Sequence, residues 1–151
     1  MKKIAIAAAI SVLLTAAAIG QEGQKIIKAE EIAWKEHPFF KGAQTVVLMG
    51  DPSKPETVVQ RIKFPANFKV APHTHPYSEV VTVISGSVGF GSAEQFDPAK
   101  GTILKAGALN ATPAKTVHFV WTGNEEAVVQ IQFTGPGGID FLNPADDPRK
   151  K

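Results

Sequence analysis

The chain has 151 residues, of which 44% are hydrophobic and 20% are charged, a composition typical of one globular domain. The formal net charge is +2 and the basic residues are scattered, which argues against a nucleic-acid partner. The sequence contains no cysteine, which excludes disulfide bonds, thiolate metal ligands and lipid attachment to a cysteine.

Residues 1–20 have the pattern of a secretory signal peptide. Lys2 and Lys3 precede an apolar run, and Ala18 and Gly20 place small residues at the two positions that a signal peptidase reads. We predict cleavage after Gly20 and a periplasmic or secreted protein without a stable membrane anchor. An uncleaved anchor is the alternative, which the weak hydrophobicity of the many alanines disfavours. Without the two lysines, the remaining 14 basic and 14 acidic residues balance.

Residues 21–42 are mixed in character and predict a short N-terminal arm. Trp34 stands among charged residues, and a His-Pro pair followed by Phe39 and Phe40 interrupts any helix. We expect the aromatic side chains to pack onto the main body. His37 has no partner at ligand spacing, and we expect it to be a surface histidine.

After Gly42 the sequence changes to short apolar runs separated by turns, which is typical of an all-β sandwich or barrel. We assign residues 43–143 to this domain and residues 144–151 to a C-terminal tail. Only residues 93–100 suggest a turn or short helix. The expected strands cover residues 45–49, 57–64, 68–70, 80–84, 87–90, 101–105, 107–112, 117–122, 127–133 and 139–142.

Three residues of metal-ligand type follow one another at odd-numbered positions, His73, His75 and Glu79. Side chains alternate sides along an extended chain, so these three are expected on one face. A first-row divalent metal needs neutral imidazoles and carboxylates on elements that cannot shift. His118, the remaining histidine in a predicted strand, is the candidate fourth ligand.

These residues resemble the two motifs of the cupins, a superfamily of small jelly-roll β-barrels. The first motif, G-x5-H-x-H-x3-E-x6-G, is matched except that Asn67 replaces the opening glycine. The second, G-x5-P-x-G-x2-H-x3-N, is matched except that Lys115 replaces a glycine and Thr122 an asparagine. The matching positions are His73, His75, Glu79 and Gly86 in the first motif and Gly107, Pro113 and His118 in the second. The chain looks most like small secreted single-domain cupins.

The resemblance implies a single jelly-roll barrel holding one divalent transition metal ion through His73, His75, Glu79 and His118. Iron, manganese, nickel, cobalt, copper and zinc all suit three nitrogens and one oxygen. We expect a metal-dependent enzyme with dioxygenase-like or related chemistry on a small organic molecule, with Glu79 able to take a proton. The alternatives are a non-catalytic metal- or ligand-binding or sensing module, and sugar binding without metal.

The neighbours of the four residues predict an apolar pocket. Val81 and Val83 continue the face of Glu79, and Val120 continues that of His118. Tyr77 has the same parity, whereas Phe119 and Trp121 should face away and support the wall or a subunit contact. By analogy with other jelly-roll cupins, we expect a homodimer.

Overall fold

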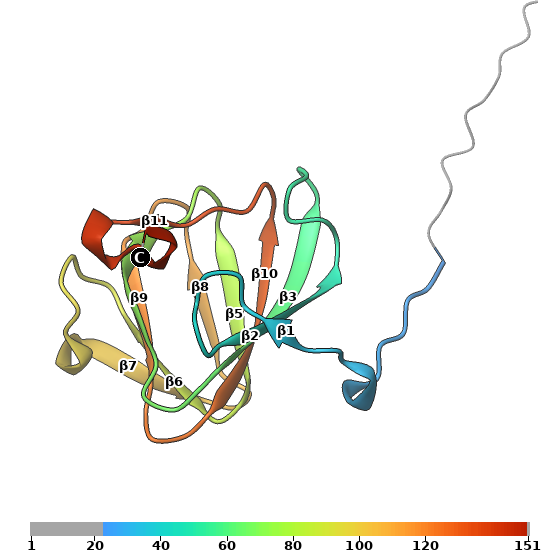
Figure 1. The fold of residues 1–151 in the computed structure, drawn as a ribbon, viewed down its shortest axis with the longest axis horizontal. Coiled ribbons are helices and arrows are strands. Elements are labelled where there is room, and N and C mark those ends of the chain that lie inside the picture. The colour runs from blue at the N-terminus through green and yellow to red at the C-terminus, as the bar shows by residue number, and fades with distance from the viewer. Residues whose placement is uncertain (1–22, 151) are drawn as a thin grey trace, which may run out of the picture.

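The computed structural model describes residues 23–150, which form two antiparallel β-sheets (Figure 1). The predicted signal peptide, residues 1–20, and its cleavage site lie outside the described residues. Over residues 23–150, no helix has the length and apolar character needed to cross a membrane. Four short 3-10 helices accompany the strands of this part of the chain: η1 (Ala29–Glu31), η2 (Pro98–Lys100), η3 (Pro144–Asp146) and η4 (Pro148–Lys150).

The larger sheet has six strands and the smaller sheet has five. In spatial order the larger contains β1 (Lys35–Glu36), β2 (Gln44–Met49), β3 (Thr57–Phe64), β10 (Ala127–Thr134), β5 (Glu79–Ser85) and β8 (Leu109–Thr112). The smaller contains β11 (Asp140–Phe141), β4 (Lys69–Thr74), β9 (His118–Thr122), β6 (Ser87–Gly91) and β7 (Gly101–Lys105). The predicted all-β jelly-roll architecture is therefore confirmed.

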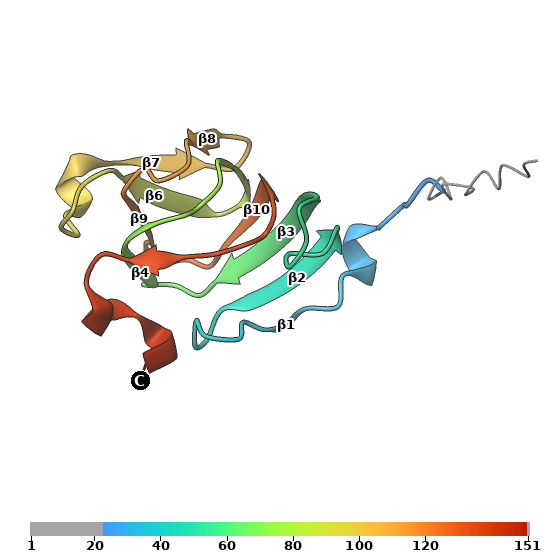
Figure 2. The same ribbon diagram turned by 90° about the horizontal axis from the view of Figure 1, so that it is seen from above.

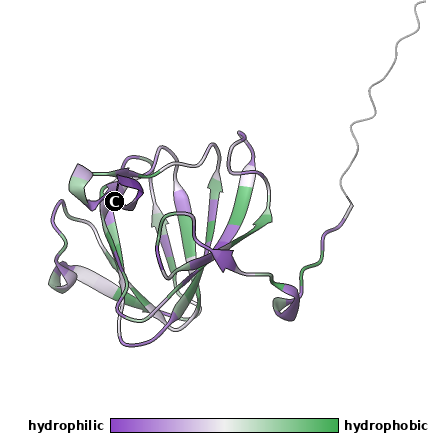
Figure 3. Ribbon diagram, in the orientation of Figure 1, coloured by the Kyte–Doolittle hydropathy of each residue, from purple (hydrophilic) through white to green (hydrophobic). Residues whose placement is uncertain are grey.

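The two sheets face each other and enclose the core (Figure 2). Buried aliphatic side chains from β3, β5 and β10 of one sheet meet those of β4 and β6 of the other, and hydrophobic residues are distributed along these strands, whereas β1 is hydrophilic (Figure 3). Among the described strands, hydrogen-bonded pairing stays within each sheet, so the expected closed barrel is a two-sheet sandwich. Its edge strands are only two to five residues long, which limits exposure of unpaired backbone groups.

β4 is longer than the sequence predicts, continuing past Val70 to Thr74. Its pairing with β9 shifts register between Val70 and His73, and Pro72 lies inside this irregular stretch. Proline is tolerated in a strand at such an irregularity because no ladder donor is required there. The Pro72 carbonyl instead accepts a hydrogen bond from the Leu142 amide at 3.0 Å. The C-terminal segment is thereby attached to the strand that carries His73.

Asn67 and Lys115, which stand where the cupin motifs have glycine, occupy tight turns. Their φ angles are 58° and 64°, in the left-handed region, and Gly86 and Gly107 also have positive φ. Both turns precede strands of the smaller sheet, β4 and β9. The backbone geometry of these turns is therefore kept without glycine, at some conformational cost for the L-residues.

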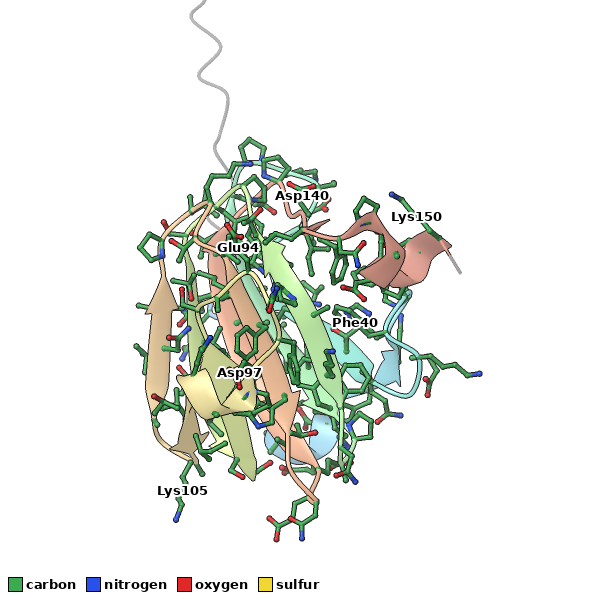
Figure 4. The ribbon with its side chains drawn as sticks, turned by 90° about the vertical axis from the view of Figure 1, so that its left-hand side faces the viewer. Phe40, Glu94, Asp97, Lys105, Asp140 and Lys150 are labelled. Carbon is green, nitrogen blue, oxygen red and sulfur yellow. The ribbon has the colours of Figure 1, made fainter. Side chains whose placement is uncertain are left out.

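The N-terminal arm packs on the main body as expected. β1 pairs with β2, the Lys63 ammonium group lies 4.8 Å from the Trp34 ring centroid, and Phe40 is 8% exposed. Phe40 lies within the body beside the C-terminal turns, whereas Lys105 and Lys150 project outward (Figure 4). The Phe40 ring contacts Phe141 edge-on at 6.5 Å, so the end of the N-terminal arm contacts the C-terminal segment.

Phe119 and Trp121 pack outside the space between the sheets, as their parity predicts. Phe119 is fully buried and its ring lies 5.0 Å from that of Phe96, in the loop after β6. Gly91 in β6 makes this possible, because a Cβ there would overlap the Phe119 ring. This outer cluster leaves the opposite face of β9 to His118.

Candidate metal centre

Three of the four predicted site residues lie in strands of two facing sheets, and the fourth follows the end of one of these strands. His73 lies in β4, Glu79 begins β5, and His118 begins β9, while His75 follows the end of β4. β4 and β9 pair with His73 opposite His118, which places their rings 4.1 Å apart. The pairing of the two strands thus holds these two side chains next to each other.

The expectation that His73, His75 and Glu79 share one face of a single extended segment is wrong. β4 ends at Thr74, the chain bends at Pro76 and Tyr77, and β5 begins in the other sheet. The carboxylate therefore faces the imidazoles from the opposite wall. The residues still converge, because the bend carries the chain from one sheet to the other.

Three imidazole nitrogens, one each from His73, His75 and His118, lie within 4.8 Å of one another and can hold a metal ion. Glu79 Oε1 lies 3.1 Å from His118 Nε2, and Glu79 Oε2 lies 3.8 Å from His75 Nε2. His73, Glu79 and His118 are buried, and His75 is nearly so. The structure thus brings all four predicted residues together.

The other ring nitrogen of each histidine is fixed by the backbone. The Nδ1–H groups of His73, His75 and His118 donate to the carbonyls of Ala71, Gly138 and Thr116, at 2.7, 2.5 and 3.0 Å. A carbonyl can only accept, so the proton of each neutral ring resides on Nδ1 and the lone pair on Nε2. This is how metal-binding histidines are commonly held.

Burial favours the uncharged form of the His73 and His75 rings. Desolvation lowers the pKa of His73 to about 3, with a further contribution from His118. Desolvation also lowers the pKa of His75, although the negative charge of Glu79 opposes it. Neutral imidazole is the form that binds metal, so His73 and His75 need not lose a proton at neutral pH.

His118 Nε2 is a buried atom without a hydrogen-bond partner among the described residues. Glu79 Oε1 is near, but the contact does not meet hydrogen-bond geometry. Two lone-pair-bearing atoms facing each other in a buried place are unfavourable unless a proton or a cation lies with them. The donor set of three imidazoles and a carboxylate therefore fits a divalent transition metal ion.

Tyr77 is stacked between His75 and Phe133, at centroid distances of 5.0 and 4.3 Å. Burial and, secondarily, the negative charge of Glu79 raise the pKa of the Tyr77 phenol. The phenol therefore stays protonated across the physiological range and is a hydrogen-bond donor at the site. Tyr77 also lines the cavity with the three histidines, which agrees with the parity of its position in the sequence.

His37 is buried, with 8% exposure, so the expectation of a surface histidine is wrong. Its Nδ1 accepts hydrogen bonds from the amides of Phe40 at 3.2 Å and Phe39 at 3.5 Å, which encloses the ring in the turn between β1 and β2. Burial lowers its pKa to about 4. It lies outside the three-histidine group, as its lack of ligand spacing suggested.

The site opens into a cavity of about 500 Å³ between the sheets. Val81 and Val120 line it as predicted, whereas Val83 is buried in the core and does not reach it. Sequence reasoning missed the contribution of Gly138, whose carbonyl fixes His75, and of Arg149, which lines the cavity. The Gly-Pro-Gly-Gly stretch at residues 135–138 is typical of a break in the chain, but its composition does not indicate which residue it contacts.

The family described as "Domain of unknown function (DUF4437)" matches residues 18–136 of the sequence. The chain belongs to this family. A search of curated proteins found no match.

Solved structures similar to this DUF4437 chain share the predicted cupin fold. The polyketide cyclase RemF from Streptomyces resistomycificus is 16% identical with a TM-score of 0.68, covering 85% of this chain and 92% of its own. An RmlC-like cupin protein from Ralstonia eutropha JMP134 is 16% identical with a TM-score of 0.64, covering 82% and 75%. The DMSP lyase DddQ from Ruegeria pomeroyi DSS-3 is 15% identical with a TM-score of 0.59, covering 74% and 61%. At these identities the likeness establishes the fold alone.

Proposed function

We propose that this DUF4437 chain is a secreted or periplasmic cupin that binds one divalent transition metal ion and uses it to transform a small organic molecule. The observation that carries the proposal is the convergence of three Nε2 lone pairs, each oriented by a carbonyl at Nδ1, beside a buried carboxylate. Such orientation is what a preorganised metal site requires.

The proposed ligands are Nε2 of His73, His75 and His118 and the carboxylate of Glu79. Iron, manganese, nickel, cobalt, copper and zinc remain candidates, since this donor set suits each of them. When bound, the ion would supply a Lewis acid that polarises an oxygen of the substrate, as in oxygenase-like or related chemistry. Support for an organic substrate comes from the adjoining cavity, whose volume of about 500 Å³ is typical of small-molecule sites.

Glu79 is the residue to which we assign proton transfer. Glu79 is 5% exposed and lines the cavity together with the three histidines, so its carboxylate is within reach of an O–H group placed there. Tyr77 would hold its proton and donate a hydrogen bond to the substrate, because its raised pKa makes it a poor base. Phe133, stacked on Tyr77, keeps that ring in place.

A second candidate function is metal or ligand binding without turnover. It is favoured by the small number of proton-transfer groups: apart from the histidines, the ionisable side chains that line the cavity in the described part of the chain are Glu79, Tyr77 and Arg149. Arg149 is paired with Asp147. A sensing module needs no more than these, so only a turnover experiment separates the two functions.

The first experiment is elemental analysis of protein purified from its own periplasm without a nickel column. We expect about one transition-metal ion per chain in the wild type and in His37→Ala, and none in a His73→Ala/His118→Ala double variant. Wild-type protein without metal would refute the proposal. N-terminal sequencing of the same sample tests secretion, with Gln21 expected as the first residue.

Turnover is tested on protein with a full complement of the metal found. Oxygen consumption and product formation are measured with a panel of diketones, phenols and sugars, and Glu79→Gln serves as the comparison because it keeps the side-chain shape but removes the base. Conversion by the wild type and its loss in Glu79→Gln support an enzyme. Binding without conversion supports the second function. Light scattering on this sample tests the proposed homodimer.

A further inference from the structure

The cavity beside the metal centre is polar at one end and apolar along its walls. Beyond the histidines and Glu79, most of its surface comes from aromatic and aliphatic side chains of both sheets and of the N-terminal turn, among them Phe39, Phe40, Phe64, Phe90, Val129 and Ile131. The part of a ligand that contacts this wall loses its contact with water. Only an apolar body gains free energy by doing so.

The polar side chains along the wall are already hydrogen-bonded to one another. Gln60 donates to the Thr45 hydroxyl at 2.7 Å, and that hydroxyl donates to the Arg61 carbonyl at 3.0 Å. A ligand carrying hydroxyl groups around its body would find few partners, and each unpaired polar group is costly in such a place. The wall therefore disfavours sugars.

The only cationic side chain among the described residues that line the cavity is Arg149. Its guanidinium donates from Nε and Nη2 to the two oxygens of Asp147 at 2.8 Å, and from Nη2 to the Ile139 carbonyl at 3.1 Å. His37 also lines the cavity, and burial lowers its pKa to about 4, so it is uncharged at neutral pH. An acidic group on the body of a ligand would therefore be desolvated without a free counter-charge.

We infer that the cavity binds a neutral molecule with an aromatic or alkyl body and its oxygen atoms gathered at one end, as in an enolisable 1,3-diketone or a phenol. This inference rests on the proposed function for the metal-binding end and on the wall for the body. Loss of one proton from such an oxygen to solvent on binding would leave one negative charge on the ligand, and this charge together with the Glu79 carboxylate would balance a divalent ion.

Three probes with the same 1,3-diketone end separate these contributions. Acetylacetone carries only that end, benzoylacetone adds an apolar ring, and 4-carboxybenzoylacetone adds a charge to that ring. Calorimetry on the zinc-loaded protein measures binding without turnover, and metal analysis after each titration checks that the probe has not removed the ion. We expect benzoylacetone to bind at least about tenfold more tightly than either of the others, because each buried methylene-sized group contributes roughly fourfold.

Two matched variants on β5 test whether the wall is responsible. Val81→Thr places a hydroxyl in the cavity wall, whereas Val83→Thr places the same group in the core, two residues further along the same face and outside the cavity. Both lose some stability. Val81→Thr should lower the affinity for benzoylacetone by about threefold to tenfold and leave acetylacetone nearly unchanged, and Val83→Thr should leave both affinities unchanged.

The outcomes distinguish this inference from the proposed function. Protein without bound metal overturns the proposed function before any probe is used. Metal-loaded protein that binds 4-carboxybenzoylacetone as tightly as benzoylacetone, or binds no probe, overturns the inference and leaves the metal site intact. Equal effects of the two variants on benzoylacetone affinity would also overturn the assignment of the wall.

Discussion

The turn that contains His37 and the cluster formed by His73, His75 and His118 line the same cavity, yet they use imidazole in opposite ways. Nδ1 of His37 accepts hydrogen bonds from backbone amides, so the ring proton resides on Nε2. In the cluster each Nδ1–H donates to a carbonyl, so Nε2 carries the lone pair. Burial alone therefore does not mark a metal ligand. The direction of the hydrogen bond at Nδ1 does.

The largest difference between the two regions is expected in metal affinity. His118→Ala removes a ligand, and we expect the affinity for zinc to fall by more than about 100-fold, because even residues that only orient ligands contribute 10- to 100-fold. His37→Ala should change it by less than about threefold. Competition against a chromophoric chelator measures both. Similar losses of zinc affinity in the two variants would contradict the distinction between a metal-binding cluster and a structural His37.

A smaller loss is expected from the segment that holds His75. Arg149 binds Asp147 and the Ile139 carbonyl, next to Gly138, which accepts from His75 Nδ1. Arg149→Ala leaves the carboxylate of Asp147 unpaired, and we expect zinc affinity to fall by about fivefold to twentyfold. Arg149→Lys should lose less zinc affinity than Arg149→Ala, because lysine keeps the positive charge but cannot make the two-point contact with Asp147. Unchanged affinity in Arg149→Ala would mean that the C-terminal segment does not orient His75.

For the His37 turn, the expected consequence is stability. His37→Ala removes the acceptor of the Phe39 and Phe40 amides, and we expect the free energy of unfolding to fall by roughly 1–3 kcal/mol. His37→Asn should recover part of this loss, because its side-chain oxygen can accept an amide proton. Urea denaturation in the presence of a chelator measures the change without a contribution from metal binding. An unchanged free energy of unfolding in His37→Ala would mean that the stability of the turn does not depend on this ring.

The last expected effect is on the pH dependence of stability. The pKa of His37 is 6.5 unfolded and about 4 folded, so between these values the unfolded chain binds a proton that the folded chain does not. Stability from the neutral ring is thus complete above pH 6.5 and is lost as pH falls toward 4. In this window the free energy of unfolding should change less steeply with pH in His37→Ala than in the wild type. The difference in slope should be up to about 1.4 kcal/mol per pH unit. Identical slopes in chelator-treated samples would contradict the assignment.

Sequence reasoning predicted most of the strands because their periodicity is local, whereas the convergence of the four site residues was implied by the resemblance to the two cupin motifs. It did not predict that His75 depends on Gly138, since that contact joins residues 63 positions apart through a C-terminal segment with little pattern of its own. It also placed His37 at the surface. The burial of this residue arises from the pairing of β1 with β2 and the packing of Phe40 on Phe141, both tertiary contacts.

The most direct test is nitrogen NMR of the four imidazole rings before and after addition of zinc. Without metal, we expect His73, His75 and His118 to carry the proton on Nδ1 and His37 on Nε2. Zinc should shift the Nε2 resonances of the first three and leave His37 unchanged. A proton on His118 Nε2 in the metal-free protein, together with no response of the three rings to zinc, would contradict the assignment of this cluster as a metal centre.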